Sequence, residues 1–467
     1  MTSDSWRIAG GWCLLCAAAV LLVWVALAHP SLRLVDFLSF SNRARRLLDG
    51  QDWIHPQYPV GYPLVLAGLQ AVTGDILVAG KVLSILSGVG AVVASWVLVG
   101  RWAALWLLFQ PALLVWGTTE GTDMPAAAMS LGALALASRG RWAASGGVLG
   151  VALLCRYTAI GVLPGLFWLV WASRSESRRG ALGRMLVAGL VVTALHWGVA
   201  LFTGASWLPG AGSNLEIGGG GAGGLWSMQT MHRFPRGWWE SARIAAADGS
   251  TMLGIAGLVL GAVWGARSWR GTRQEERGGS GPPRREVALA LVIYASSHLA
   301  ILAVFFPNPR LALPVTLALA LGAAWIRPWW LLATATGFVG FASVPGAMKL
   351  EPAEAALAAV AREVSDLRGP FLSTSPWFYK QEDGWLVPSI PMREAGGDPR
   401  RLSPTGVLAF ARRAGFRHVV VDAGRVGATY PGLRSLLRSE PPAGLELVVD
   451  RDGWRVYAVG DPQPTDP

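Results

Sequence analysis

Charged side chains are scarce in this sequence. Asp, Glu, Lys and Arg make up only 15% of the 467 residues, whereas hydrophobic residues make up 52%. A water-soluble globular protein has about 25% charged residues, so the composition excludes a wholly soluble protein. Apolar windows of roughly 16 to 22 residues recur along the first 345 positions, and this length suits a hydrocarbon core of about 30 Å. We therefore expect a polytopic α-helical membrane protein.

Cysteine and histidine are rare as well. The three cysteines, Cys13, Cys16 and Cys155, all lie in apolar segments, so no disulfide framework is implied. The six histidines are scattered without metal-ligand spacing, and we expect hydrogen-bonded packing roles for His196 and His298. P-loop and dinucleotide fingerprints are absent. The sequence predicts no cofactor.

Positive charge is in excess, with a formal net charge of +11. The arginines cluster between apolar windows, where the positive-inside rule places them, so nucleic-acid binding is not predicted. With the amino terminus in the cytoplasm, this pattern fits about eleven spans. They are 9–28, 76–99, 102–117, 122–138, 142–155, 157–173, 183–203, 251–268, 287–306, 310–326 and 329–345.

The segment from Trp142 to Trp171 has two interpretations. As one span it would place Arg156 at mid-membrane, which costs about 2.5–3.5 kcal/mol even on a lenient scale. As two short helices that meet at Arg156, it places this arginine at the outer surface. We expect the second arrangement.

The character of the chain changes after residue 345. Short strand-like segments such as FRHVVVDA alternate with helix-like segments, and a strand pair is joined around Arg451–Gly453. We expect a transmembrane domain at 1–345 and a soluble α/β domain at 346–467. An odd number of spans places this second domain outside the cytoplasm.

Acidic residues are absent from the interior of the expected spans but occur at outer helix ends. Asp36 follows the first span, and Glu120 and Asp123 lie in the turn TTEGTD. Taken alone, each carboxylate is a solvated cap, and Asp123 is a candidate helix N-cap. Together with Arg156 they predict a cleft that holds acids for proton transfer and cations for a phosphate.

The first outer loop contributes two further candidates. VDFLSFSNRARRLLDG (35–50) predicts an amphipathic interfacial helix with its arginines mostly on the polar face. Arg43 and Arg46 either pair with lipid headgroups or bind a lipid-linked phosphate. The sequence HPQYPVGYPLVL then predicts a rigid elbow that brings His55, Tyr58 and Tyr62 to a substrate pocket. A plain loop-to-helix transition, with Tyr62 in the aromatic belt, is the alternative.

Several motifs in this order resemble the GT-C superfamily of membrane glycosyltransferases, which includes aminoarabinose transferases and protein mannosyltransferases. They are the aspartate after the first span, YPVGYPLVLAGL, GDILVAGKVLSILSG, TTEGTDMPAAA, GVLGVALLCRYTAIGVLPG and FFPNPRLALPVTLALA, together with the C-terminal HVVVD. The last of the membrane motifs departs from the family pattern, because leucine replaces the usual tyrosine at 311. The resemblance covers nearly the whole chain.

The resemblance implies an inverting transfer of a sugar from a polyprenyl-phosphate carrier to an acceptor hydroxyl on a lipid, glycan or protein, at the outer face of the cytoplasmic membrane. By position, Asp36 is the expected general base. Asp123 and Glu120 are expected to orient the acceptor or donor.

Cations are expected to stabilise the leaving phosphate. Arg156, Lys81 and one of Arg43 and Arg46 are the candidates, with Arg310 as a further one. A divalent cation held by Asp36, Glu120 and Asp123 is an alternative that stays open. A flippase or transporter of lipid-linked sugars, and an inactive GT-C-like protein, are alternative functions.

Overall fold

The computed structural model describes residues 3–29, 36–51, 53, 59–173, 177–203, 239, 243, 284–304, 312–322, 329–349, 352–375, 378–392, 402–438 and 442–460. The chain divides into two compact units. The first comprises Met1–Ala28, Arg46–Leu69 and Ala79–Lys349. The second comprises His29–Arg45, Gln70–Val78 and Leu350–Pro467.

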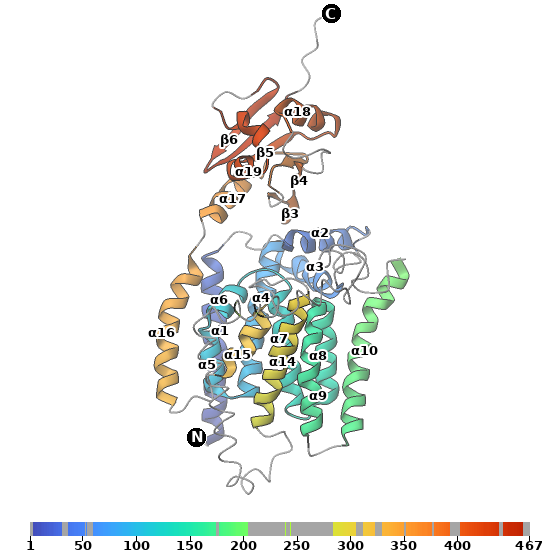
Figure 1. Cartoon of the computed structure of the whole chain (residues 1–467), viewed down its shortest axis with the longest axis vertical. Coiled ribbons are helices and arrows are strands. Elements are labelled where there is room, and N and C mark those ends of the chain that lie inside the picture. Colours follow the sequence, from blue (N-terminus) through green and yellow to red (C-terminus); the bar gives the residue numbers. More distant parts are fainter. Residues whose placement is uncertain are drawn as a thin grey trace, which may run out of the picture. The chain divides into compact units, whose positions relative to one another are not determined.

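The first unit is helical, and most of its helices run side by side (Figure 1). Its elements are α1 (Ser3–Leu27), α3 (Gly61–Thr73), α4 (Ile76–Leu98), α5 (Arg101–Leu108), α6 (Pro111–Trp116), α7 (Asp123–Ala137), α8 (Trp142–Cys155), the 3₁₀ helix η1 (Tyr157–Val162), α9 (Leu163–Ala172), α10 (Arg178–Thr203), α14 (Arg284–Val304), α15 (Leu313–Ala320) and α16 (Trp329–Met348). Their apolar side chains form one large buried cluster. The end of α3 and the start of α4 belong to the second unit, which includes Gln70–Val78.

Among the residues that the structure describes, three helices are long and apolar enough to cross a membrane: Ile76–Leu98, Arg178–Val199 and Arg285–Leu302. Shorter apolar helices cover Gly11–Leu27, Asp123–Ala137, Trp142–Cys155 and Tyr157–Ala172. The expected span 251–268 lies outside the described residues. The count of eleven spans therefore stays a prediction, whereas the helical fold class is confirmed.

The expected span 102–117 is two helices rather than one. Pro111 starts α6, and the residue before it, Gln110, has an extended backbone with φ −70° and ψ 132°. Proline has no amide hydrogen and disfavours a helical conformation at the preceding residue, so the chain breaks between α5 and α6.

The chain also breaks at Arg156, as the sequence predicted. α8 ends at Cys155, Arg156 is extended with φ −158° and ψ 124°, and η1 begins at Tyr157. Two elements therefore meet at this arginine.

Glycines allow α8 to pack closely against α10. A Cβ atom on Gly146 would lie 1.9 Å from the backbone oxygen of Met185, and one on Gly150 would lie 2.7 Å from Cβ of Val192. The spacing of four residues places both glycines on one helix face, as in close helix packing within membranes. This contact fixes the position of the α8 end that carries Arg156.

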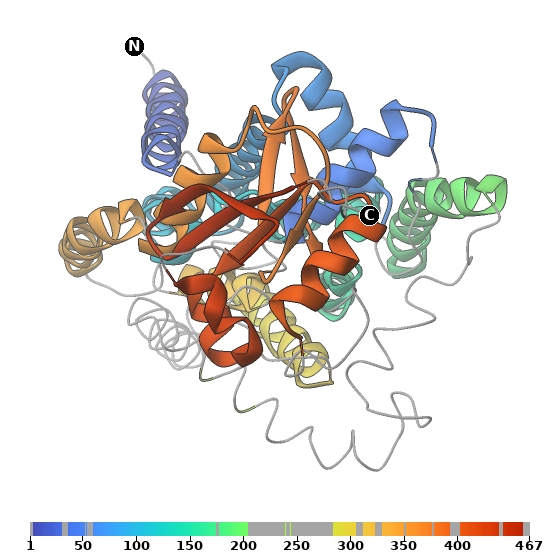
Figure 2. The ribbon, with the colours of Figure 1, turned by 90° about the horizontal axis from the view of Figure 1, so that it is seen from above.

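The second unit contains a five-stranded sheet of order β4-β1-β5-β7-β6. Its strands are β1 (Phe371–Ser373), β4 (Ile390–Pro391), β5 (His418–Asp422), β6 (Leu445–Arg451) and β7 (Trp454–Val459). β1 pairs in parallel with β4 and β5, while β7 pairs antiparallel with β5 and β6. The strands lie next to one another in orange to red in Figure 2.

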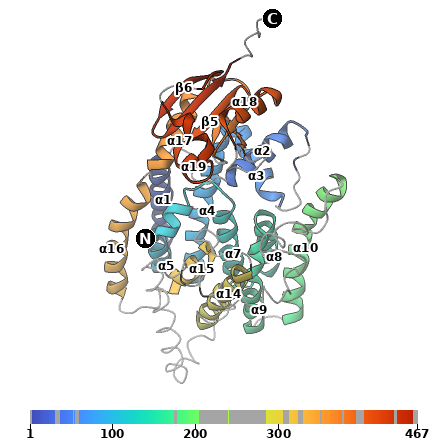
Figure 3. The ribbon, with the colours of Figure 1, turned by 45° about the horizontal axis from the view of Figure 1, so that its top comes forward.

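Helices cover both faces of this sheet. On one face, Val419 and Val421 of β5 pack in a cluster with residues of α18 (Pro404–Arg413), α19 (Ala423–Ala428) and the 3₁₀ helix η6 (Pro431–Leu437). On the other, Val420 packs with residues of α17 (Pro352–Glu363). Figure 3 shows α17, α18 and α19 beside β5 and β6. The all-apolar VVV run is thus explained, because a strand covered on both faces is hydrophobic throughout.

The second unit has two further features, of which the second, α2 (Asp36–Leu48), is the amphipathic helix that the sequence predicted at 35–50. β2 (Tyr379–Glu382) pairs antiparallel with β3 (Trp385–Pro388) in a separate two-stranded sheet. α2 begins in the second unit and passes into the first between Arg45 and Arg46.

Candidate active site

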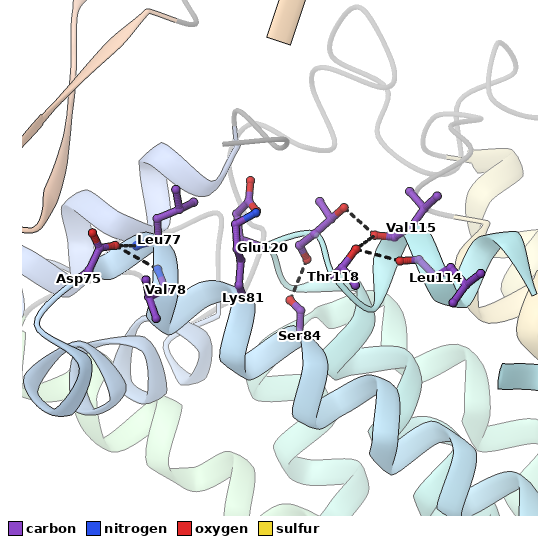
Figure 4. A network of polar contacts seen from close by, with 10 residues as sticks. Asp75, Leu77, Val78, Lys81, Ser84, Leu114, Val115, Thr118 and Glu120 are labelled. Carbon is purple, nitrogen blue, oxygen red and sulfur yellow. Dashed lines mark hydrogen bonds and ion pairs between the residues drawn. The ribbon is translucent and has the colours of Figure 1, made fainter. Parts of the chain in front are cut away.

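The TTEGTD motif forms a braced turn between α6 and α7. Thr118 and Thr119 donate side-chain hydrogen bonds to backbone carbonyls one turn back in α6. Ser84 of α4 donates to the backbone oxygen of Thr119 at 2.7 Å (Figure 4). Gly121 has φ +150°, a conformation that disfavours a side chain. These contacts fix the direction of the two carboxylates in the turn.

Glu120 faces Lys81 of α4. The Lys81 Nζ atom lies 3.7 Å from a carboxylate oxygen of Glu120, whose side chain is fully buried. Figure 4 shows the two side chains reaching the same place from different elements. At this distance the pair is electrostatic rather than a short hydrogen bond.

Asp123 faces Arg156. A guanidinium nitrogen lies 2.5 Å from Asp123 Oδ1, and the same nitrogen donates to Thr122 Oγ1 at 2.8 Å. The expected N-cap role of Asp123 is wrong, since Asp123 is the first residue of α7 and follows Thr122. Its carboxylate instead pairs with Arg156, which directly follows the end of α8, so the end of α8 meets the start of α7.

The two ion pairs leave their cations in different surroundings. The Arg156 side chain is 22% exposed, whereas that of Lys81 is 10% exposed. Charges in a water-poor setting interact more strongly than in bulk water. The first unit thus pairs Glu120 with Lys81 and Asp123 with Arg156, while the predicted cleft that also holds Asp36 stays a prediction.

Tyr62 of α3 lies near Glu120 and Asp123. It is completely buried. Burial, together with the nearby charge of Glu120, raises the pKa of Tyr62 well above its usual value. A fully buried ring makes no contact with solvent, so the aromatic-belt alternative for Tyr62 is wrong.

Gly61 explains the glycine of the YPVGYP motif. A Cβ atom at this position would lie 2.7 Å from both Cβ and the backbone oxygen of Leu154, two residues before Arg156. Only glycine lets the start of α3 approach the end of α8 so closely. The elbow is therefore built against the segment that carries the arginine.

The structure describes three of the other predicted residues. Asp36 begins α2 in the second unit and is exposed. The expectation that the loop arginines lie on the polar face is wrong for Arg43, which is only 7% exposed and lies 5.8 Å over the Phe40 ring. Arg46 is exposed. His55, Tyr58 and Arg310 lie outside the described residues.

Sequence reasoning missed two residues near Arg156. Thr122 accepts a hydrogen bond from the arginine, and the TTEGTD motif gave no reason to choose it over its neighbours. His196 of α10 packs edge-on against Tyr157, with ring centroids 6.1 Å apart. Neither of its ring nitrogens has a hydrogen-bond partner among the described residues, so the expected hydrogen-bonded packing role does not hold for His196.

Among the described residues, no group of three or more His, Cys, Asp or Glu side chains gathers as a metal site would require. Within that part of the chain the arrangement offers carboxylates as proton acceptors and cations as anion ligands. Such groups together suit displacement of a phosphate leaving group.

No protein-family model matches the sequence, and no curated protein matches it. Solved structures do match.

The ArnT crystal structure from Cupriavidus metallidurans bound to undecaprenyl phosphate has a TM-score of 0.57 at 14% identity, covering 99% of this chain and 100% of that chain. The apo structure of the same protein gives 0.56 at 16% identity, with 98% and 100% covered. The archaeal oligosaccharyltransferase AglB from Archaeoglobus fulgidus, in complex with an inhibitory peptide and a dolichol-phosphate, gives 0.52 at 11% identity, with 99% and 75% covered.

These neighbours are membrane glycosyltransferases of the GT-C superfamily. Likeness at such low identity is a likeness of fold, and it extends over the whole length of this chain. The protein therefore has the fold of the GT-C membrane glycosyltransferases.

Proposed function

We propose that this protein transfers a sugar from a polyprenyl-phosphate carrier to an acceptor hydroxyl at the outer face of the cytoplasmic membrane. The observation that carries the proposal is the meeting of Lys81, Glu120, Asp123 and Arg156 at the ends of four helical segments of a GT-C fold. A charged cluster at helix ends in a largely apolar unit calls for a function, because burying charges is costly.

The cations suit the donor. Arg156 presents a planar guanidinium that pairs with phosphate in two-pronged geometry, and Lys81 adds a compact point charge. Charge builds on the phosphate as the bond to the sugar breaks, so fixed cations there lower the barrier. The polyprenyl carrier itself is supported by the lipid phosphates found with ArnT and AglB. One of Arg43 and Arg46 is the loop arginine that we expect to join the site.

The carboxylates suit the acceptor. Transfer with inversion needs a base that removes the proton of the attacking hydroxyl. We assign this role to Asp36, which is exposed at the start of α2. Asp123 is already engaged by Arg156 at 2.5 Å, which suits orientation of substrate rather than proton removal.

The orientation follows from the charge pattern. We place the amino terminus in the cytoplasm and the α/β unit outside, as the positive-inside rule requires. A reporter that is active only outside the cytoplasm should give a signal when it is fused after residue 467. A signal from a reporter that is active only in the cytoplasm would contradict this orientation.

The experiment that tests the function compares membranes from a deletion strain with those from the complemented strain. The deletion should remove one sugar from an envelope lipid, glycan or protein, and should leave the polyprenyl-phosphate sugar accumulated. A flippase would give a different result, because the purified protein would then fail to transfer sugar when donor and acceptor are both supplied in detergent. Activity should persist after chelation of divalent cations; its loss, with recovery on adding a cation, would overturn the metal-independent form of the proposal.

A further inference from the structure

The start of α4 is joined to a distant hairpin. The first amide groups of a helix have no partner within the helix. Asp75 Oδ1 accepts from the amides of Leu77 at 2.8 Å and Val78 at 3.0 Å (Figure 4). The amide of Ile76 instead donates to the backbone oxygen of Gly384, at 2.8 Å. A residue more than 300 positions away therefore completes this helix end.

Gly384 lies in the two-residue turn between β2 and β3. Asp383 has φ +50° and Gly384 φ +74°, the backbone signs of a tight hairpin turn. A Cβ atom on Gly384 would lie 2.0 Å from the backbone oxygen of Gly74, in the turn before α4. Glycine is thus needed here for close approach as well as for backbone conformation. Both turns belong to the second unit.

The base of this hairpin is firmly held. The Lys380 side chain is only 3% exposed, donates to the backbone oxygen of Leu367 at 3.1 Å, and pairs with Glu382 at 3.0 Å. Ser389 also donates to the backbone oxygen of Phe378 at 3.0 Å. The hairpin is therefore a fixed support for the turn that it contacts, rather than a loose loop.

α4 carries this contact to the candidate active site. Lys81 follows Ile76 by five residues, about 7.5 Å along the helix at ~1.5 Å per residue. Ser84, one turn further, bonds the acidic turn at Thr119. We propose that the Asp383–Gly384 turn is a positioning element, which seats the start of α4 and thereby holds Lys81 opposite Glu120.

The proposal gives the α/β unit a part in the reaction. Its hairpin would set the position of a cation that binds the donor. The link to catalysis rests on the proposed function, whereas the seating of α4 does not, and the two are tested separately.

A matched pair of variants isolates the contact. Asp452 and Gly453 form the same kind of turn between β6 and β7, with φ +49° and +83°, but a Cβ atom on Gly453 has no neighbour closer than 3.9 Å. Asparagine tolerates positive φ better than other side chains. Gly384→Asn should therefore disrupt the contact with Gly74, while Gly453→Asn should change only its own turn.

The first readout needs no transferase activity. The sequence has three lysines, of which Lys349 is exposed and Lys380 is buried. Purified full-length protein is treated with a water-soluble amine reagent, and labelling is measured by mass spectrometry. We expect Gly384→Asn to raise Lys81 labelling relative to Lys349 by about threefold or more, because the ion pair with Glu120 is 3.7 Å long and easily opened. Gly453→Asn should leave it unchanged.

Hydrogen–deuterium exchange in the segment that contains Ile76 provides a second readout. It should quicken in Gly384→Asn only, since the amide loses its carbonyl partner. Unchanged exchange in Gly384→Asn would overturn the contact. Faster exchange with unchanged Lys81 labelling would overturn the positioning of Lys81.

The kinetic readout tests the link to catalysis. A displacement of about 1 Å can cost up to about 100-fold in rate, and we expect Gly384→Asn to lower kcat/KM for the donor by about tenfold, with Gly453→Asn near the wild-type value. If Lys81 labelling changes but kcat/KM is equal in the two variants, the claim that the position of Lys81 affects the rate of transfer is contradicted. A wild-type protein without transfer would overturn the proposed function alone, since labelling and exchange still decide the seating of α4.

Discussion

The two ion pairs of the candidate active site differ in length and in burial. Arg156 and Asp123 meet at 2.5 Å with a second bond to Thr122, while Lys81 and Glu120 are 3.7 Å apart. A short, doubly bonded arginine is held in one orientation. A lysine at the longer distance keeps donors that can turn to another anion. We therefore infer that Arg156 both stabilises the site and binds the donor phosphate, whereas Lys81 chiefly binds the phosphate.

The largest effect on folding should come from the shorter pair. Arg156→Gln leaves the Asp123 carboxylate buried without its cation, and breaking such a pair costs about 3 kcal/mol, near the low end for buried pairs because Arg156 is partly exposed. Thermal unfolding in detergent measures the loss. Arg156→Gln combined with Asp123→Asn should recover part of the stability but no activity. A single variant as stable as the wild type would contradict the structural role of this pair.

Lys81→Met should chiefly lower activity. Removing this cation leaves the fully buried Glu120 carboxylate without Lys81, so some stability is lost as well, but loss of a cation at the leaving phosphate should lower kcat by about 100-fold. Steady-state kinetics with a polyprenyl-phosphate sugar provides the measurement, and Lys349→Met, at an exposed lysine, is the control. If Lys81→Met instead unfolds the protein while Arg156→Gln does not, the assignment of the two pairs is reversed.

The smallest of these effects should come from the elbow. Gly61→Ala forces the start of α3 away from Leu154, and Tyr62 moves with it away from the acidic turn. We expect kcat to fall by about tenfold with little change in KM, since the substrate contacts stay in place. Gly68→Ala, in the same helix with open space around its Cβ, should have wild-type kinetics. Equal activity of the two variants would contradict the claim that close packing at Gly61 is needed for catalysis.

The sequence predicted those features that depend on local pattern. The break at Arg156 follows from the cost of a charge inside an apolar run, and β5 and the β6–β7 hairpin follow from the VVV run and the Asp452–Gly453 turn. The meeting of Glu120, Asp123 and Arg156 was anticipated because all three lie at expected helix ends.

Features that depend on tertiary contacts could not be read in this way. The partner of Asp123 is a guanidinium from a helix that begins later in the chain, so local pattern favoured an N-cap. Arg43 is buried although its helical periodicity placed it on the polar face. The contact of Gly384 with Gly74 joins two ordinary turns that carry no signal of each other.

The central claim concerns acids and cations that act on one lipid-linked substrate, and Asp36 tests it most directly. Purified protein, polyprenyl-phosphate sugar and acceptor are mixed in a single-turnover reaction, in which the product anomer and the released polyprenyl phosphate are measured together. The account predicts inverted product with the wild type and at least a 100-fold slower reaction with a well-folded Asp36→Asn variant. Near-normal transfer by Asp36→Asn would contradict it.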